Sequence, residues 1–128
     1  LYNIATTVSL IIAQRLGRRL CQHCKKPQKL PREVLIEQGF RPDEIEELTL
    51  YQAVGCEYCT QGYKGRFGLY EILAMNTKMS ELILNGANSI DILKLAKSQG
   101  MKTLRESGLI KVKQGITSLD EVNQVTTD

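Results

Sequence analysis

Four cysteines are the residues whose type and spacing best define a chemistry in this chain. They form two pairs, Cys21-x2-Cys24 and Cys56-x2-Cys59, separated by residues 25–55. A C-x2-C knuckle turns both of its thiolates toward one centre, and two knuckles supply the four sulfur ligands of a closed tetrahedral zinc site. No cysteine remains for an intermolecular disulfide. We therefore predict that these four cysteines bind one zinc ion, which is structural because no coordination position is left open for water.

Basic residues flank both cysteine pairs. Four thiolates on a divalent metal leave a net double negative charge, and positive neighbours favour the ligating form of a thiol. The basic residues within a few positions of the ligands are Arg19, Lys25, Lys26, Lys64 and Arg66. Their placement agrees with the predicted zinc site.

Other uses of the cysteines remain open. Two disulfides would suit an oxidising compartment, but nothing in the sequence indicates export. A thioredoxin-like redox motif needs one C-x-x-C, which leaves the second pair unexplained. Iron in a rubredoxin-like cage uses similar spacing and is the main rival, although such proteins pack aromatic cores and this chain has 5% aromatic residues and no Trp. His23, inside the first knuckle, is interpreted as a solvated loop residue.

Length and composition exclude several classes of protein. The chain has 128 residues, 42% of them hydrophobic, which predicts one folded domain or two very small ones. Its longest apolar run, residues 8–13, is far shorter than the roughly 20 residues of a membrane span. No secretory signal fits, because the first basic residue, Arg15, follows that run. The chain begins at Leu1, so we expect it to be a piece of a longer protein.

The sequence lacks the motifs of a complete enzyme. No Gly-Lys dipeptide occurs, and hence no G-x-x-x-x-G-K-[ST] phosphate-binding loop. With a single histidine and no plausible nucleophile–base pair, the chain is not expected to be active by itself.

The net charge of +3 is unevenly distributed. Residues 1–32 carry basic side chains and no acid, whereas residues 33–48 carry six acids and one base, Arg41. The basic block could bind nucleic acid. The alternative is that both blocks are solvated faces that partly neutralise each other, and the scarcity of aromatic side chains near Lys25 argues against a platform for stacked bases.

The first half of the chain predicts few regular elements. Val8, Ile11, Ile12 and Leu16 recur at helical spacing, which predicts a helix over residues 4–16 that Gly17 ends. Residues 21–65 hold all three prolines and read as irregular, with short helices over 32–38 and 43–48, the second capped by Asp43. Residues 66–73 predict a strand.

Capping signals predict four helices after Asn76. Thr77 and Ser89 are the expected caps of the first two helices. Thr103 with Glu106, and Ser118 with Glu121, are spaced as capping boxes for the other two. Glycines 86, 100 and 115 follow the expected helix ends. We expect the tail to form a compact helical bundle.

Three stretches of the chain together resemble the C-terminal part of the type II/IV secretion ATPase family, and are closest to its type IV pilus assembly (extension) ATPases. The stretches are IIAQRLGRRLCQHCKKP, GCEYCTQGYKGRFGLYEIL and GMKTLRESGLIKVKQGITSLDEVNQVT. The resemblance covers nearly the whole chain and is least specific over residues 30–50. At Gly17 several relatives carry a larger residue.

The resemblance implies an α/β fragment with four parts. Residues 1–20 would be the C-terminal edge of a RecA-like ATPase core. The last helix and strands of that core would come from this edge together with a returning strand at 66–76. Residues 21–65 would be the four-cysteine metal-binding subdomain, and residues 77–128 the C-terminal helical subdomain. The phosphate loop would lie before Leu1.

The resemblance also implies a function for the full-length protein. It would be a homohexameric cytoplasmic ATPase, peripheral to the inner membrane, that uses ATP and Mg²⁺ to drive an inner-membrane platform protein in type IV pilus assembly, with no nucleic acid partner expected. Arg66 would lie at the edge of the nucleotide site, although it could equally offset the charge of the zinc–thiolate centre. A type II secretion ATPase of the same family and a zinc-ribbon nucleic-acid-binding module are the alternatives.

Overall fold

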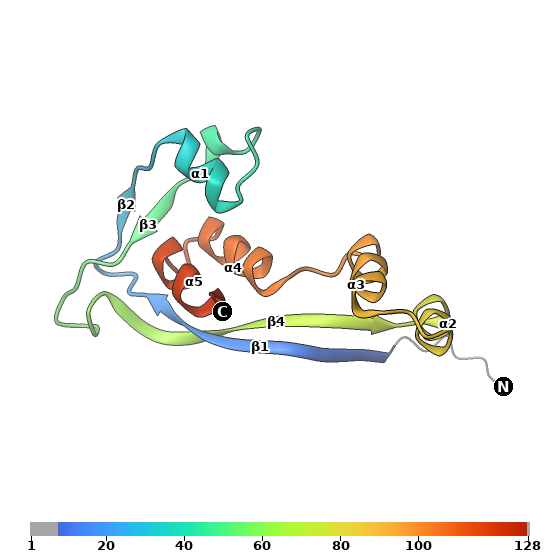
Figure 1. Ribbon diagram of the computed structural model, residues 1–128. Helices are drawn as coiled ribbons and strands as arrows, with labels where there is room; N and C mark the ends of the chain where they lie inside the picture. Colours follow the sequence, from blue (N-terminus) through green and yellow to red (C-terminus); the bar gives the residue numbers. More distant parts are fainter. Residues whose placement is uncertain (1–7, 128) are drawn as a thin grey trace.

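A computed structural model of the chain describes residues 8–127, and a long β-hairpin is its main feature (Figure 1). Strand β1 (Val8–Leu20) pairs antiparallel with β4 (Tyr63–Met75), from Val8 opposite Met75 to Leu20 opposite Tyr63. The cysteine-containing segment emerges from one end of this hairpin, and the first two C-terminal helices lie at the other (Figure 1). The predicted strand at 66–73 is confirmed and is longer at both ends.

The helix predicted over residues 4–16 is wrong where it can be compared, because residues 8–16 belong to β1, while residues 4–7 lie outside the described residues. The helical spacing misled because Ile11, Ile12 and Leu16 do not share a buried face: all three are at least half exposed. In the part of the chain that the structure describes, no second sheet packs on either face of this two-stranded ribbon. Burial therefore does not impose the strict alternation of apolar and polar residues by which strands are recognised in a sequence.

Gly17 lies inside β1 instead of ending a helix. A Cβ atom at this position would come within 2.6 Å of the ring of Phe67, the residue opposite it in β4. The absence of a side chain at Gly17 therefore lets the Phe67 ring lie across the neighbouring strand. A larger residue at this position would require the ring to move.

The segment between the hairpin strands contains short elements. Strands β2 (Lys26–Gln28) and β3 (Leu50–Gln52) pair antiparallel. The predicted helix over 32–38 is confirmed as α1 (Arg32–Gln38), which Gly39 ends in the left-handed conformation with φ +117°. The second predicted helix is reduced to one 3₁₀ turn, η1 (Ile45–Glu47), and Asp43 does not cap it.

Four helices follow β4, as predicted: α2 (Thr77–Leu84), α3 (Ser89–Ser98), α4 (Leu104–Lys113) and α5 (Leu119–Thr126). Asn76 and Asn88 cap α2 and α3, one residue before the caps expected from the sequence. The capping box of Thr103 and Glu106 is present. In α5 only half of the box forms, because Ser118 accepts a hydrogen bond from Glu121 N–H while the Glu121 carboxylate binds elsewhere.

The four helices do not form one bundle. They pack in two pairs, α2 with α3 and α4 with α5, joined by an extended link at residues 99–103 (Figure 1). The first pair packs on the end of β4 around Leu73, Met79 and Ala96. The bundle prediction failed because the capping signals locate each helix but do not say which partner its apolar face meets.

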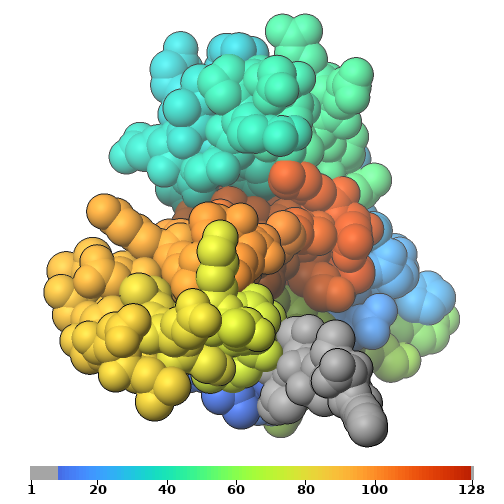
Figure 2. Space-filling view, turned by 90° about the vertical axis from the view of Figure 1, so that its right-hand side faces the viewer, coloured from blue at the N-terminus to red at the C-terminus, as the bar shows by residue number. Residues whose placement is uncertain are grey.

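The second helix pair, α4 with α5, shares a core with the cysteine segment, residues 21–62, which joins β1 to β4. This core has seven buried residues, three from the cysteine segment and four from α4 and α5: Leu35, Phe40, Leu50, Leu109, Val112, Leu119 and Val122. Figure 2 shows α4 and α5 lying between the cysteine segment above and the α2–α3 pair below. Within residues 8–127, no helix combines the length and the apolar character needed to span a membrane.

Candidate metal centre

The four cysteine sulfurs converge on one point. All four Sγ atoms lie within 4.8 Å of one another. The separation is 3.7 Å for Cys21–Cys56 and for Cys56–Cys59, and 3.8 Å for Cys24–Cys59. A tetrahedral site with metal–sulfur bonds of about 2.3 Å places its sulfurs about 3.8 Å apart. The four free thiols are therefore arranged as the ligands of one tetrahedral metal ion, and no pair is bonded as a disulfide.

Backbone contacts place the two knuckles opposite each other. Cys21 directly follows β1, and its N–H donates to the carbonyl of Gly62, the residue before β4, at 2.8 Å. Gly55 N–H donates to Cys24 Sγ at 3.3 Å. Gly62 has φ +95°, and a Cβ there would come within 2.5 Å of Ala53, so only glycine fits at this crossing.

The thiols influence each other's ionisation. Burial opposes ionisation of Cys21, but the backbone N–H groups of His23 and Cys24 together with the neighbouring thiols outweigh it and lower the pKa of Cys21 to about 7. The Tyr58 N–H favours the Cys56 thiolate, yet burial and the other three sulfurs raise the pKa of Cys56 to about 12. Four adjacent sulfurs thus resist full ionisation unless a cation compensates their charge.

Two side chains outside the predicted site bring the knuckles together. His23, on the first knuckle, is exposed as predicted and is not among the converging ligands. Its ring stacks on Tyr58 of the second knuckle, with 4.6 Å between the ring centroids. No local sequence pattern predicts this contact, because the two residues lie far apart along the chain.

The loop between α4 and α5 was also missed by sequence reasoning. It contacts the point where β1 enters the first knuckle: Leu20 N–H donates to Ile116 O at 2.8 Å, and Lys25 Nζ donates to Gly115 O at 3.1 Å. The carboxylate of Glu121, at the start of α5, accepts hydrogen bonds from both the backbone N–H and the guanidinium of Arg18. The only signal at these positions was the capping-box spacing of Ser118 and Glu121.

Glu121 is 3% exposed, and its carboxylate accepts hydrogen bonds from the Arg18 backbone N–H and guanidinium. Burial works against this charge, but the hydrogen bonds and the positive charge of Arg18 outweigh burial and lower the pKa of Glu121. A buried carboxylate with a bidentate arginine partner holds both side chains in a fixed geometry.

Arg66 lies beside the cysteine centre. It is exposed, stands opposite Arg18 in the hairpin, and lines an open depression of about 550 Å³ with Tyr58, Cys59 and Lys64. Within residues 8–127 no ion pair involves Arg66. The structure therefore places a guanidinium that is open to solvent next to the second knuckle.

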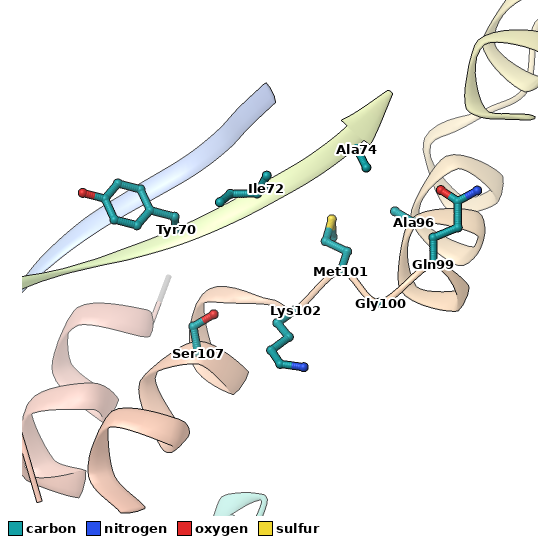
Figure 3. A pocket seen from close by; sticks show the side chains of 9 residues that line it. All are labelled: Tyr70, Ile72, Ala74, Ala96, Gln99, Gly100, Met101, Lys102 and Ser107. Atoms are coloured by element: carbon teal, nitrogen blue, oxygen red, sulfur yellow. The ribbon is translucent and has the colours of Figure 1, made fainter. Parts of the chain in front are cut away.

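A second depression, of about 340 Å³, lies between β4 and the link that joins α3 to α4 (Figure 3). The side chain of Met101 points from the link toward β4, while Lys102 points away from it (Figure 3). None of the nine residues lining this depression is acidic, a histidine or a cysteine. The chemistry of the described residues is concentrated at the opposite end of the hairpin.

Comparison with known proteins identifies similar chains. The family described as "Type II/IV secretion system protein" matches residues 1–124. The chain is 51% identical over 127 residues to the type IV pilus assembly ATPase PilB of Pseudomonas aeruginosa, covering 99% of this chain and 22% of that protein. It is 42% identical to PilB of Thermus thermophilus, covering 94% of this chain and 14% of the relative.

A type II secretion protein also matches. The type II secretion system ATPase E of Vibrio cholerae is 38% identical over 126 residues, covering 98% of this chain and 24% of the relative. The chain thus spans about a fifth of the length of most of the curated relatives it matches.

Proposed function

We propose, since the chain belongs to the type II/IV secretion system protein family, that it is the C-terminal part of a motor ATPase that powers type IV pilus assembly. The observation that carries the choice of pilus assembly is the order of identities. Four relatives named as pilus assembly ATPases share 42–51% identity with the chain and a fifth shares 37%, whereas two named as type II secretion proteins share 38% and 32%.

In this proposal the full-length protein is a cytoplasmic homohexamer, peripheral to the inner membrane, that acts on the platform protein of the pilus machine. The phosphate loop that would hold ATP and Mg²⁺ is not among the 128 residues, so most of the nucleotide site belongs to residues outside this chain. The exposed apolar side chains of β1 support its assignment to the edge of a RecA-like core, since such a surface needs covering. These residues are Leu10, Ile11, Ile12 and Leu16.

The four-cysteine centre is proposed to hold a structural zinc. The donor set fits, because four thiols at tetrahedral spacing suit a soft-ligand metal and leave no open coordination position. When bound, the metal supplies a fixed cross-link between the ends of β1 and β4. Elemental analysis of the purified, reduced full-length protein should give about one zinc per chain. Stoichiometric iron, visible as the red colour of a ferric four-thiolate site, would show that the centre binds iron instead of zinc. The absence of any bound metal would overturn the proposed site.

A genetic experiment tests the assignment to pilus assembly. A strain without the full-length gene should lose surface pili while retaining type II secretion, and a copy of the gene should restore pili. Loss of secretion with normal piliation would instead assign the protein to type II secretion.

Arg66 is proposed either to contact nucleotide phosphate or to offset the charge of the metal centre. Its exposed guanidinium suits a phosphate oxygen from its own or a neighbouring subunit, and its place beside Cys59 suits the second role. In the full-length protein, Arg66→Ala should lower ATPase activity at least tenfold with zinc retained if the first role holds. Weakened zinc retention with activity largely intact would support the second. The matched control is Arg15→Ala, because Arg15 is also an exposed arginine of the hairpin but lies on β1, farther from the cysteines.

A further inference from the structure

The polar side chains that the structure buries gather in the α4–α5 loop, defined as residues 114–121 so that it includes the first turn of α5. Among residues 8–127, Thr117, Ser118 and Glu121 are the buried polar or charged residues, each no more than 3% exposed. All three lie between α4 and the first turn of α5. A buried polar group is stable only when its hydrogen bonds are made, so the partners of this loop show what it holds in place.

The loop binds the last residues of β1. Glu121 accepts hydrogen bonds from the backbone N–H of Arg18 at 2.8 Å and from its guanidinium at 2.7 Å. Thr117 Oγ1 donates to the carbonyl of Arg18 at 2.8 Å, and Ile116 O accepts from Leu20 N–H. Residues 18–20, directly before Cys21, are therefore held by hydrogen bonds to their backbone N–H and C=O groups.

The same loop binds the first residue of β4. The Tyr63 hydroxyl and Ser118 Oγ lie 2.7 Å apart in a hydrogen bond, and the Arg18 guanidinium lies 4.1 Å from the centre of the Tyr63 ring. Tyr63 begins the strand that follows the second knuckle. One loop thus contacts both strands at the point where each meets its cysteine pair.

We propose that Glu121 is a positioning residue for the four-cysteine centre: by holding Arg18, it fixes β1 so that Cys21 and Cys24 meet Cys56 and Cys59. The inference rests on the proposed zinc centre. The two ligand pairs come from segments far apart along the chain, so bringing them together has an entropic cost that a preformed hairpin end lowers. Outer contacts that orient ligands change metal affinity by about 10–100-fold when removed.

The chain offers a matched control for Glu121. Glu106 is also the third residue of its helix, is also a glutamate whose carboxylate accepts a backbone N–H, and contacts Thr103 instead of a strand near the cysteines. A change to glutamine removes the same charge from both residues, but Glu121 is buried and Glu106 is exposed, so helix content must be shown to be retained in each variant. A purely structural role for Glu121 predicts equal metal affinity for Glu121→Gln and Glu106→Gln.

The experiment is a cobalt titration of the full-length protein in competition with a chelator. Absorbance from thiolate-to-cobalt charge transfer reports four-sulfur ligation, and circular dichroism reports helix content. Glu121→Gln should bind cobalt at least tenfold more weakly than the parent and Glu106→Gln, with helix content retained. Equal affinities of the two variants would overturn the positioning role. If the parent bound no cobalt, the proposed metal centre itself would fail, whatever the outcome for pilus assembly.

A second variant decides the matter if Glu121→Gln does not fold. Tyr63→Phe removes only the hydroxyl that binds Ser118 and leaves the ring beneath Arg18. We expect it to lower cobalt affinity about threefold, as the loss of one hydrogen bond that orders the site implies. Tyr70→Phe, on the same strand, is the control and should bind as the parent does. Unchanged affinity in Tyr63→Phe would then overturn the proposal.

Discussion

The two ends of the β-hairpin are held together in different ways. At the cysteine end, which comprises residues 18–65 with α4 and α5, a seven-residue core and a partly buried ion pair between Arg18 and Glu121 join segments distant in sequence. At the distal end, which comprises residues 73–101, three buried residues form the core. Large side chains there remain exposed, including Leu84 at 84% and Ile90 at 66%.

The two ends therefore differ in how far a local loss of structure should spread through the fold. At the cysteine end α1, β3, α4 and α5 contribute to one core, so none of them can lose its structure without exposing the apolar surface of the others. At the distal end α2 and α3 each have an asparagine cap and pack mainly on each other and on the end of β4. We therefore expect damage to spread across the cysteine end and to stay local at the distal end.

Removing the proposed zinc should have the largest effect. Structural zinc contributes about 10–16 kcal/mol of folding free energy in small peptides. In Cys56→Ser, or after chelation, amide hydrogen exchange should accelerate across residues 21–65 and also in α4 and α5, because these helices share the core of Leu35, Phe40 and Leu50. Helices α2 and α3 should keep their protection. Retained protection in α4 and α5 would show that the two cores are not divided as the packing indicates.

Truncating one core side chain at each end should cost a similar amount but spread differently. Leu109→Ala and Met79→Ala each remove a buried side chain and should destabilise the protein by about 2–5 kcal/mol. Leu109→Ala should also speed exchange in α1 and β3, whereas Met79→Ala should affect α2, α3 and the end of β4. Exchange measured residue by residue tests this, and a spread from Met79 into the cysteine segment would contradict it.

Adding a methyl group between α4 and α5 should have a smaller effect. A Cβ at Gly108 would come within 2.7 Å of Val122 Cγ1, so Gly108→Ala forces the two helices apart. We expect a loss of about 1–3 kcal/mol in unfolding free energy by denaturant titration. Alanine is the better helix former, so a gain in stability would show that the contact between α4 and α5 adapts easily.

Acid should weaken the cysteine end slightly through Glu44. The Lys113 ammonium of α4 and the Arg41 backbone N–H bind its carboxylate and lower the pKa of Glu44. The pair therefore stabilises the protein above the unfolded-state pKa of about 4.3. This contribution is lost as the pH falls through the lower folded-state pKa.

The size of the Glu44 effect is limited by its partner, because the Lys113 side chain remains 34% exposed to solvent. Such an ion pair is worth less than about 1 kcal/mol. Comparing unfolding free energies of the parent and Lys113→Gln at neutral and acid pH isolates the pair, since both proteins lose their metal alike. The difference between the two proteins should vanish at acid pH, and a constant difference would contradict the role of the pair.

Local signals predicted much of this architecture. The C-x2-C spacing identified four cysteines whose sulfurs do converge, because a knuckle fixes two ligands within a few residues. Caps and glycines predicted the four C-terminal helices to within one or two residues, because a helix end is determined by side chains adjacent to it. These features depend only on neighbours along the chain.

Features that depend on distant partners could not be predicted. The pattern of Ile11, Ile12 and Leu16 predicts a helix because nothing in residues 8–16 shows that β4 pairs with them. Glu121 was assigned to a capping box, yet its carboxylate binds Arg18, 103 residues away in sequence. The packing of α4 and α5 on residues 35–50 likewise depends on tertiary contacts that no local pattern contains.

The length of the hairpin has a mechanical consequence. Antiparallel strands of 13 residues extend about 40 Å at roughly 3.4 Å per residue. The strands are anchored at one end by the Glu121 loop, and α2 and α3 lie at the other. A tilt of about 5° at the anchored end would displace α2 and α3 by about 3–4 Å over that length. The hairpin therefore has the dimensions of a lever arm, which converts a small rotation beside the cysteines into a displacement as large as a side chain at the distal helices.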